Sequence, residues 1–234
     1  VFGGETNQQS IMVPLQFWFC RNPGCALPLI ALQYHEVKVN LEFESYANCK
    51  TSAVSTTSAS LSGVSLWVDY IYLDTDERRR FAQVSHEYLI EQLQFTGDEA
   101  GKTNASLRLN FNHPVKELVW VGTTADAGVY SSNLSNAKLQ LNGHDRFAER
   151  NGDYFNKVQP YQHHTNIPSG NVYVYSFALK PEEHQPSGTC NFSRIDNATL
   201  QQTWGSAPTK IKVFAVNYNV LRVMSGMGGL AYSN

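Results

Sequence analysis

Apolar and polar residues alternate strictly through residues 36–44. Val37, Val39, Leu41 and Phe43 fall on one side, and charged or amide side chains occupy the positions between them. A period of two residues is typical of a strand with one buried face. We therefore predict a half-buried antiparallel strand over this stretch.

Further β-prone runs follow along the chain, separated by turn residues. The predicted strands are residues 12–19, 66–73, 91–96, 106–111, 115–121, 137–141, 172–179, 189–200, 211–216 and 220–224. Pro114 stands between two of them, where its missing N–H costs least. Short strands with turn signals at this spacing predict an all-β sandwich or jelly roll.

Four segments depart from this pattern. Residues 84–90 predict one or two helical turns, and residues 144–151 are the other helix candidate. Residues 45–62 are rich in Ser, Thr and Ala and predict a loop. The glycine-rich tail at 225–229 predicts a flexible arm that can cross onto a neighbouring molecule.

Composition supports the β-sandwich and excludes some classes of function. Charged residues make up 16% of the chain, against roughly 25% in globular proteins. The net charge of -2 argues against direct nucleic-acid binding through basic patches. No run reaches the ~18 apolar residues of a transmembrane helix, and the start of the chain shows no signal-peptide pattern.

The four cysteines, Cys20, Cys25, Cys49 and Cys190, do not have the spacing of a zinc site. We interpret them as buried free thiols, with disulfides as the alternative. Free thiols fit folding in a reducing cytosol.

A faint internal repeat suggests two similar domains. Residues 68–71, followed by arginines, are echoed by residues 216–219, followed by Arg222. Only one copy has its early strands here, so we expect the chain to start inside the first domain.

Long blocks of sequence carry a family resemblance. They read PLQFWFCRNPG at 14–24, continuing at 26–37, then DYIYLDTDERRRF at 69–81, AVNYNVLR at 215–222 and MGGLAY at 227–232. In content and order they closely resemble the major capsid proteins of large icosahedral DNA viruses, of the phycodnavirus and iridovirus kind. Blocks of this length are far more specific than a short motif.

The resemblance implies two jelly rolls in tandem. Residues 1–84 would form the last strands of the first roll plus a connector, and residues 85–234 a complete second roll. Because the first roll lacks most of its strands here, its remaining strands would lack partners. We expect the chain alone to aggregate.

The resemblance also implies a structural function without catalysis, cofactor or metal. The protein would form a homotrimer, a pseudo-hexagonal capsomer of the virion shell. Its partners would be itself, neighbouring capsomers and minor capsid proteins. It would fold in the host cytoplasm and act in the virion.

Four N-x-[ST] sequons are present, at Asn104, Asn133, Asn191 and Asn197. Several arise by chance in a chain rich in Asn, Ser and Thr, so an unmodified state is the simpler reading. Because the resembling capsid proteins can carry glycans on their outward tips, all four are kept as glycosylation candidates. Asn133 has the most loop-like setting and should be the most accessible.

A metal site would draw on His144, His163, His164 and His184. Adjacent histidines in a strand or loop point apart, and no carboxylate stands at the offset of a cupin-type site. We interpret these residues as polar loop histidines.

Two other functions stay open as alternatives. A β-sandwich glycosidase would use two carboxylates from Asp69, Asp74, Asp76 and Glu77. The adjacent arginines at 78–80 favour ionised carboxylates, whereas a general acid must be protonated. We therefore interpret this run as an ion-paired hinge between domains or a contact between subunits.

The second alternative is a lectin-like module that stacks sugars on aromatic rings. The aromatic residues of the predicted strands are more simply core. Trp204 is the exception, because it stands next to a turn and is expected to be exposed. The aromatic candidates are Phe17, Trp18, Phe19, Trp67, Trp120, Tyr173, Tyr175, Phe177 and Trp204.

Overall fold

The computed structural model describes residues 11–49, 60–124, 129–131 and 133–233. The chain divides into two compact units, each considered by itself. The first comprises Val1–Ile90 and Val220–Ser233, and the second comprises Glu91–Asn219. Most of the predicted 45–62 loop, residues 50–59, lies outside the described residues.

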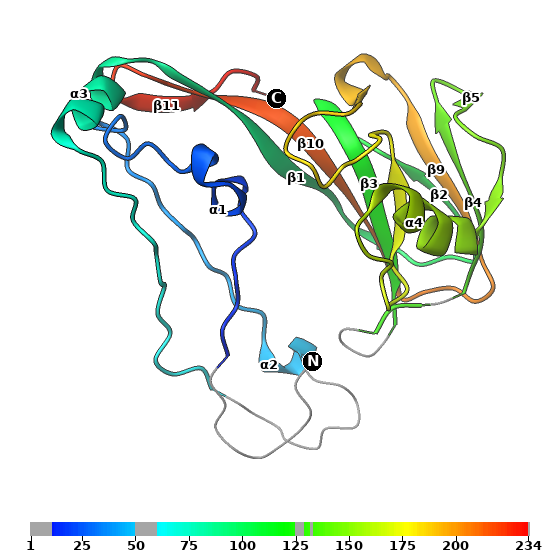
Figure 1. Ribbon diagram of the computed structural model, residues 1–234. Helices are drawn as coiled ribbons and strands as arrows, with labels where there is room; N and C mark the ends of the chain where they lie inside the picture. The colour runs from blue at the N-terminus through cyan, green and yellow to red at the C-terminus, as the bar shows by residue number, and fades with distance from the viewer. Residues whose placement is uncertain (1–10, 50–59, 125–128, 132, 234) are drawn as a thin grey trace. The chain divides into compact units, whose positions relative to one another are not determined.

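Strands dominate from residue 86 onward (Figure 1). They are β1 His86–Ala100, β2 Asn104–Arg108, β3 Pro114–Thr123, β4 Leu134–Leu141, β5 His144–Asp145, β6 Arg150–Asn151, β7 Tyr173–Ser176, β8 Cys190–Asn191, β9 Ala198–Trp204, β10 Lys210–Met224 and β11 Met227–Leu230.

Helices are short. They are α1 Trp18–Arg21, η1 Pro23–Cys25, α2 Tyr46–Cys49, α3 Thr75–Gln83, the π-helix η2 Tyr154–Val158, α4 Gln159–His163 and η3 Phe192–Arg194. None within the described ranges is long and apolar enough to cross a membrane.

Two antiparallel sheets form the β-sandwich. One has the order β1-β10-β3-β7, with β8 and β11 at its margins, and the other has the order β2-β9-β4-β5, with β6 beside β4. Apart from the β4–β5 hairpin, successive main strands alternate between the sheets, which is the topology of a jelly roll. The predicted all-β jelly-roll fold is therefore confirmed.

The core lies between the sheets and is built on aromatic rings. Strand β9 shows how the sequence builds it, since Leu200, Gln202 and Trp204 are buried while Gln201 and Thr203 between them are half-buried. The Trp204 ring meets Tyr173 edge to face, with centroids 5.8 Å apart. Gly122 has no side chain, and a Cβ there would lie 2.7 Å from the Trp204 ring. Its position on β9 and its close approach to Gly122 therefore hold Trp204 in the core, although a turn follows it.

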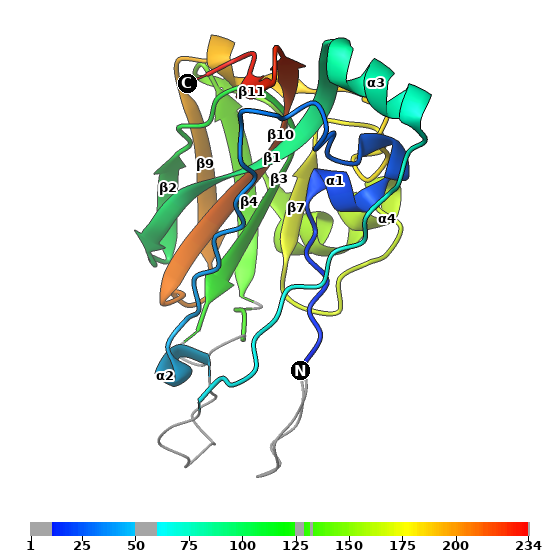
Figure 2. The same ribbon diagram turned by 90° about the vertical axis from the view of Figure 1, so that its left-hand side faces the viewer.

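Both predicted helices are wrong, and the helices that form, α3 among them, were not predicted. Residues 86–100 form β1, because pairing with β10 overrides the local preference of 84–90. The 144–151 stretch contains β5 and β6, which both pair with β4. The missed helices η2 and α4 follow in a polar segment, and Figure 2 shows α4 beside β7.

In the first unit, the predicted strands 12–19, 36–44 and 66–73 do not form. Apart from α1, these residues are extended backbone outside any ladder (Figure 1). The apolar positions of 36–44 stay open, with Val37 45% and Phe43 58% exposed. A strand needs a hydrogen-bonded neighbour, and the described residues offer none to these segments.

The tail 225–229 is a hairpin instead of a flexible arm. Ser225 and Gly226 both have positive φ, 54° and 81°, as a tight two-residue hairpin turn requires. The turn joins β10 to β11, and the Gly226 carbonyl accepts a hydrogen bond from Tyr34 N at 2.9 Å. The hairpin thus holds the 32–35 segment within the first unit.

The cysteines are free, but the prediction of burial holds fully only for Cys25. Cys190 is half-buried, and Cys20 and Cys49 are exposed. Cys20 lies in the short helix α1, and Cys49 is the last residue of α2.

Replacing Gly226 by Ala should loosen the hairpin. A Cβ at Gly226 would lie 2.4 Å from the Tyr34 ring, and the positive φ adds backbone strain. We expect a loss of about 1–2 kcal/mol, read as faster hydrogen exchange of the Tyr34 amide. The matched control is Gly229→Ala, because a Cβ there meets nothing within 4 Å. Equal exchange in the two variants would contradict the packing described.

Replacing Trp204 by Ala should destabilise the sandwich. Trp204 is 1% exposed, so the variant leaves a large cavity and should lower the free energy of unfolding by about 3–5 kcal/mol. Trp67→Ala is the control, because Trp67 is 91% exposed and should change stability by less than about 0.5 kcal/mol. Urea unfolding followed by circular dichroism measures both. A neutral Trp204→Ala variant would refute the assigned core.

Candidate assembly surfaces

The extended segments of the first unit expose large apolar side chains. Met12, Trp67 and Tyr72 are each more than 90% exposed. Surfaces this apolar usually mark sites of protein contact. The other large exposed apolar residues of these segments are Ile11, Val13, Phe17, Val37, Val39, Leu41, Phe43, Leu61, Val64, Leu66, Val68, Tyr70 and Ile71.

The second unit exposes apolar side chains on the outer face of β1. Leu93 and Phe95 are exposed there, and the Phe95 ring stacks on Phe214 of β10 with centroids 4.7 Å apart. Both residues lie outside the core between the sheets. This pair of strands therefore presents a second apolar surface.

Three of the four acidic residues considered for a glycosidase, Asp74, Asp76 and Glu77, lie at the start of α3, whereas Asp69 is an exposed residue of the segment before it. Asp74 caps the helix, since its Oδ1 accepts a hydrogen bond from Glu77 N at 2.9 Å. Asp76 faces Arg79 at 3.8 Å, as expected for residues three apart on a helix. No residue of α3 is buried, so these carboxylates do not lie in the enclosed site that a catalytic acid needs.

The histidines do not converge on a metal site. His163 Nδ1 lies 2.9 Å from the Leu179 carbonyl oxygen, whereas His164 contacts Glu117 and Glu182. The two adjacent histidines thus engage different groups, but the interpretation of both as loop histidines is wrong, because His163 is the last residue of α4 and His164 caps that helix. Within the described ranges, no cluster of three or more His, Cys, Asp or Glu side chains is arranged to hold a metal ion.

The prediction that Trp204 is exposed is wrong. The residue is buried, and its Nε1 donates a hydrogen bond to Gln202 Oε1 at 2.9 Å. Its ring therefore offers no platform for a sugar. Trp67 is the exposed tryptophan, and it lies in the first-unit segments already described.

The four sequon asparagines are all exposed. Asn133 Nδ2 donates to Ser206 Oγ at 2.8 Å, and Asn191 Oδ1 accepts from Ser193 N at 3.1 Å. At Asn197 the Thr199 hydroxyl lies 3.3 Å from the asparagine Oδ1, so the two polar groups of the sequon face each other. Asn104 lies at the start of β2.

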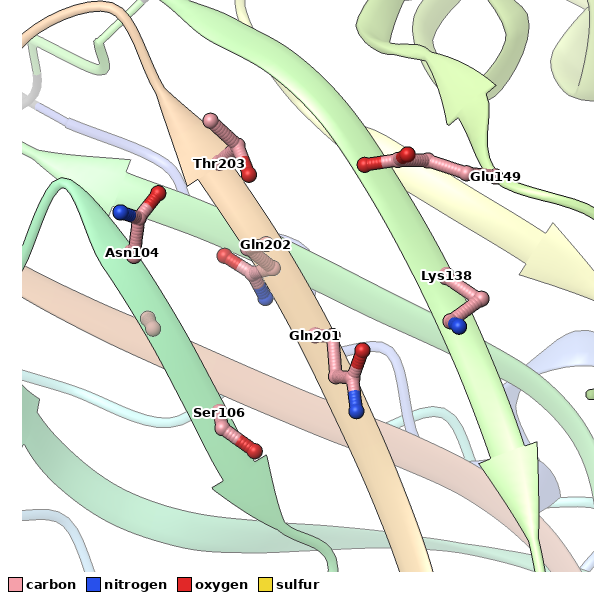
Figure 3. Close-up of a pocket in the computed structure, with 8 residues that line it drawn as sticks. Asn104, Ser106, Lys138, Glu149, Gln201, Gln202 and Thr203 are labelled. Carbon is pink, nitrogen blue, oxygen red and sulfur yellow. The ribbon is translucent and has the colours of Figure 1, made fainter. Parts of the chain in front are cut away.

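Asn104 also lines a shallow polar hollow of about 220 Å³ on the outer side of β2, β9 and β4 (Figure 3). Lys138 and Glu149 bring opposite charges to it, but Lys138 already pairs with Asp145 at 3.3 Å. A second hollow, of about 480 Å³, is lined by Tyr130, Asn133, Asn171 and neighbouring hydroxyl and small residues. Neither lining contains a histidine or a cysteine.

Sequence reasoning missed the buried charges of β3. Lys116 is buried, and its Nζ lies 2.6 Å from Glu91 Oε1. Two consecutive charged residues, Lys116 and Glu117, interrupt an otherwise apolar strand. This interruption could have indicated a buried charge. In a regularly alternating strand, one of two consecutive residues faces the core, and here both are charged.

Comparison with known proteins places the sequence among viral capsid proteins. The family described as large eukaryotic DNA virus major capsid protein matches residues 77–229. The family described as major capsid protein N-terminus matches residues 3–74.

Individual relatives agree. The major capsid protein of Pyramimonas orientalis virus is 60% identical over 99% of this chain and 63% of its own length. That of Paramecium bursaria Chlorella virus 1 is 46% identical over 97% of this chain and 67% of its own length. The chain thus spans about two thirds of the curated relatives it matches.

A solved structure agrees as well. The crystal structure of PBCV-1 VP54 superposes with a TM-score of 0.75 at 42% identity, covering 95% of this chain and 70% of that chain. The matched sequence, the jelly-roll topology and the relatives all lead to one assignment: the chain belongs to the major capsid protein family of large eukaryotic DNA viruses.

Proposed function

We propose that this chain is the C-terminal part of a shell-forming subunit and acts by packing against copies of itself. The exposed apolar segments of the first unit are the observation that carries the proposal. They have the side chains of half-buried strands but no sheet to join within the described residues. A structural subunit needs such surfaces, whereas an enzyme needs a site with convergent polar groups.

The proposed domain boundary follows the same reasoning. Residues 1–84 would complete a first jelly roll, whose other strands would pair with segments such as 36–44. Residues 85–234 would form the second roll, in which β1 to β10 already provide both sheets. The two family matches, to residues 3–74 and to residues 77–229, support a division in this region.

We propose a homotrimeric capsomer that packs against neighbouring capsomers and minor capsid proteins in the virion. The apolar β1–β10 surface around Phe95 would contribute to the trimer contact. A stable contact needs about 1,600 Å² of buried surface, and flat sheet faces suit such areas. A net charge of -2 imposes little repulsion between copies. Folding would take place in the host cytoplasm, and the subunit would have no catalytic activity and no cofactor.

The trimer is tested by light scattering of the protein released from virus particles under mild conditions. We expect a mass of three subunits, each about one and a half times this chain, from the share of the relatives covered. A monomer would contradict the proposal.

The β1–β10 surface is tested separately with recombinant full-length variants. Phe95→Asp should shift the equilibrium toward monomer, because it places a charge in an apolar contact. Glu99→Gln, at an exposed polar position of the same strand, is the control and should stay trimeric. If Phe95→Asp assembles like the control, the trimer contact lies elsewhere.

We also propose that the sequons at Asn104, Asn133, Asn191 and Asn197 carry glycans on the virion. Their exposure supports access, with Asn133 beside the larger hollow.

Glycopeptide mass spectrometry of virion protein should find added hexose-containing mass on at least one of the four sequon peptides. The peptide containing Asn142, an exposed asparagine outside any sequon, is the internal control. Unmodified mass for all four peptides would refute the proposed modification.

A further inference from the structure

The residues between β7 and β8 form a closed loop on the second unit. At its ends, Leu179 N donates to the Ser187 carbonyl at 3.2 Å and Lys180 N donates to Ser187 Oγ at 2.9 Å. Residues 179–187 are here named the latch segment. Three of its residues contact β3 or α4 through polar atoms, and these contacts determine whether the segment stays in place.

Lys116 provides the fixed anchor. Val216 pairs with Glu117 and Asn217 pairs with Val115, so Lys116 is the extra residue of a bulge in β3. Its carbonyl accepts hydrogen bonds from Phe177 N and Ala178 N, at 2.9 and 3.1 Å.

The Lys116 side chain extends the anchor into the segment. Its Nζ donates to the Pro181 carbonyl and to Glu91 Oε1, both at 2.6 Å, and the ammonium lies 5.5 Å from the Tyr218 ring centroid. This side chain is only 2% exposed.

His164, at the end of α4, provides a second attachment that depends on its charge. Its Nε2 lies 3.2 Å from Glu117 Oε2 of β3, and its Nδ1 lies 3.1 Å from Glu182 Oε1 of the latch segment. The His164 and Glu117 side chains are 14% and 13% exposed. The Glu117 oxygen and the His164 Nε2 are both buried and form no aligned hydrogen bond, so the attraction between them depends on the charge of His164.

Only the imidazolium form suits two carboxylates. It carries N–H groups on both ring nitrogens, whereas neutral imidazole keeps one and turns a lone pair toward the other carboxylate. Glu182 is further held by Thr165, whose amide N donates to Oε2 at 2.9 Å and whose hydroxyl contacts the same oxygen.

The other charged groups nearby have partners of their own. Lys116 contacts Glu91, and Lys180 of the segment pairs with Glu183 at 3.1 Å on the surface. His163 contacts a carbonyl oxygen, that of Leu179. Among the described ion pairs, His164 is thus the cation that faces Glu117 and Glu182.

We propose that His164 is a pH-dependent latch, which holds the 179–187 segment against β3 when the imidazole is protonated and loosens it when the imidazole is neutral. The Lys116 anchor keeps the segment attached at its start, so loosening affects the part around Glu182. The inference goes beyond the shell function and does not depend on it.

The direction of the pH effect follows from the two titrating groups. Contact with the Glu117 carboxylate raises the pKa of His164 above its ordinary value, against the effect of burial, and Glu182 adds to the rise. The stabilisation is therefore complete below about pH 6.5 and is lost as the pH rises through the raised pKa.

Glu182 determines the lowest pH at which the latch stays closed. Burial favours its neutral form, but hydrogen bonds from Thr165 and His164 outweigh burial and lower the pKa of Glu182. Its contribution is present above its ordinary pKa of about 4.3 and is lost as the pH falls through the lowered pKa. The latch is thus closed in mildly acidic solution.

Hydrogen exchange of the recombinant intact protein, between pH 5.5 and 9, tests the latch. Each rate is divided by the intrinsic rate at the same pH. In the wild type, protection of the Thr165 and Glu183 amides should fall about tenfold as the pH rises, as expected for losing a charged hydrogen bond. In His164→Gln, protection should be low at all pH values.

Two controls separate the latch from general unfolding. His144→Gln removes an exposed histidine and should keep the wild-type pH dependence. The Leu109 amide, which donates to the Ala198 carbonyl in the core, should stay protected in every variant. Constant protection in the wild type, or an equal fall in His164→Gln, would overturn the proposal.

Discussion

Backbone hydrogen bonding between strands is the constraint on which this structure depends. Each buried N–H and C=O needs a partner, and a strand obtains most of its partners from its neighbours in the sheet. In the second unit, each main strand has a neighbour, and the two sheets enclose an aromatic core. In the first unit, residues 36–44 have the side-chain pattern of a strand but no paired neighbour among the described residues, and they remain extended and exposed. Stretches with equally clear strand patterns thus have different structures, and the presence or absence of a pairing strand among the described residues accounts for the difference.

The same constraint explains what could be predicted from sequence. Strand patterns at 106–111, 115–121 and 137–141 correspond to β2, β3 and β4, because their partners lie in the same chain. The pattern at 36–44 was equally clear, yet it states only which face a strand would bury and says nothing about whether a partner is present. The 84–90 segment shows the reverse case, since pairing with β10 converts a weak helical preference into β1.

The functional surfaces were harder to predict than the fold. Trp204 stands beside a turn, but the inward phase of β9 places it in the core opposite Gly122. The face of the sheet on which a residue lies depends on the register of the whole strand, and the turn residues next to it do not determine that face. The charges of β3 were also missed, because a bulge at Lys116 breaks the alternation on which the reading relied. The long family blocks, in contrast, identified the family directly from sequence.

Buried charge has a different role from the apolar core. The core stabilises the sandwich through the packing of apolar side chains. The contacts of Lys116 and His164 instead attach one loop to that framework, and only the His164 contact changes with pH. A shell subunit can thus combine a rigid scaffold with a loop whose attachment responds to its surroundings.

We propose that the first-unit segments are strands whose partners lie in a complete first roll. Hydrogen exchange of residues 36–44, compared between the 234-residue chain and the intact subunit in virus particles, tests it most directly. We expect the amides of residues 36–44 to exchange fast in the isolated chain and to be strongly protected in the particle. Fast exchange in both would contradict it, because the segment would then lack a sheet partner even in the assembled shell.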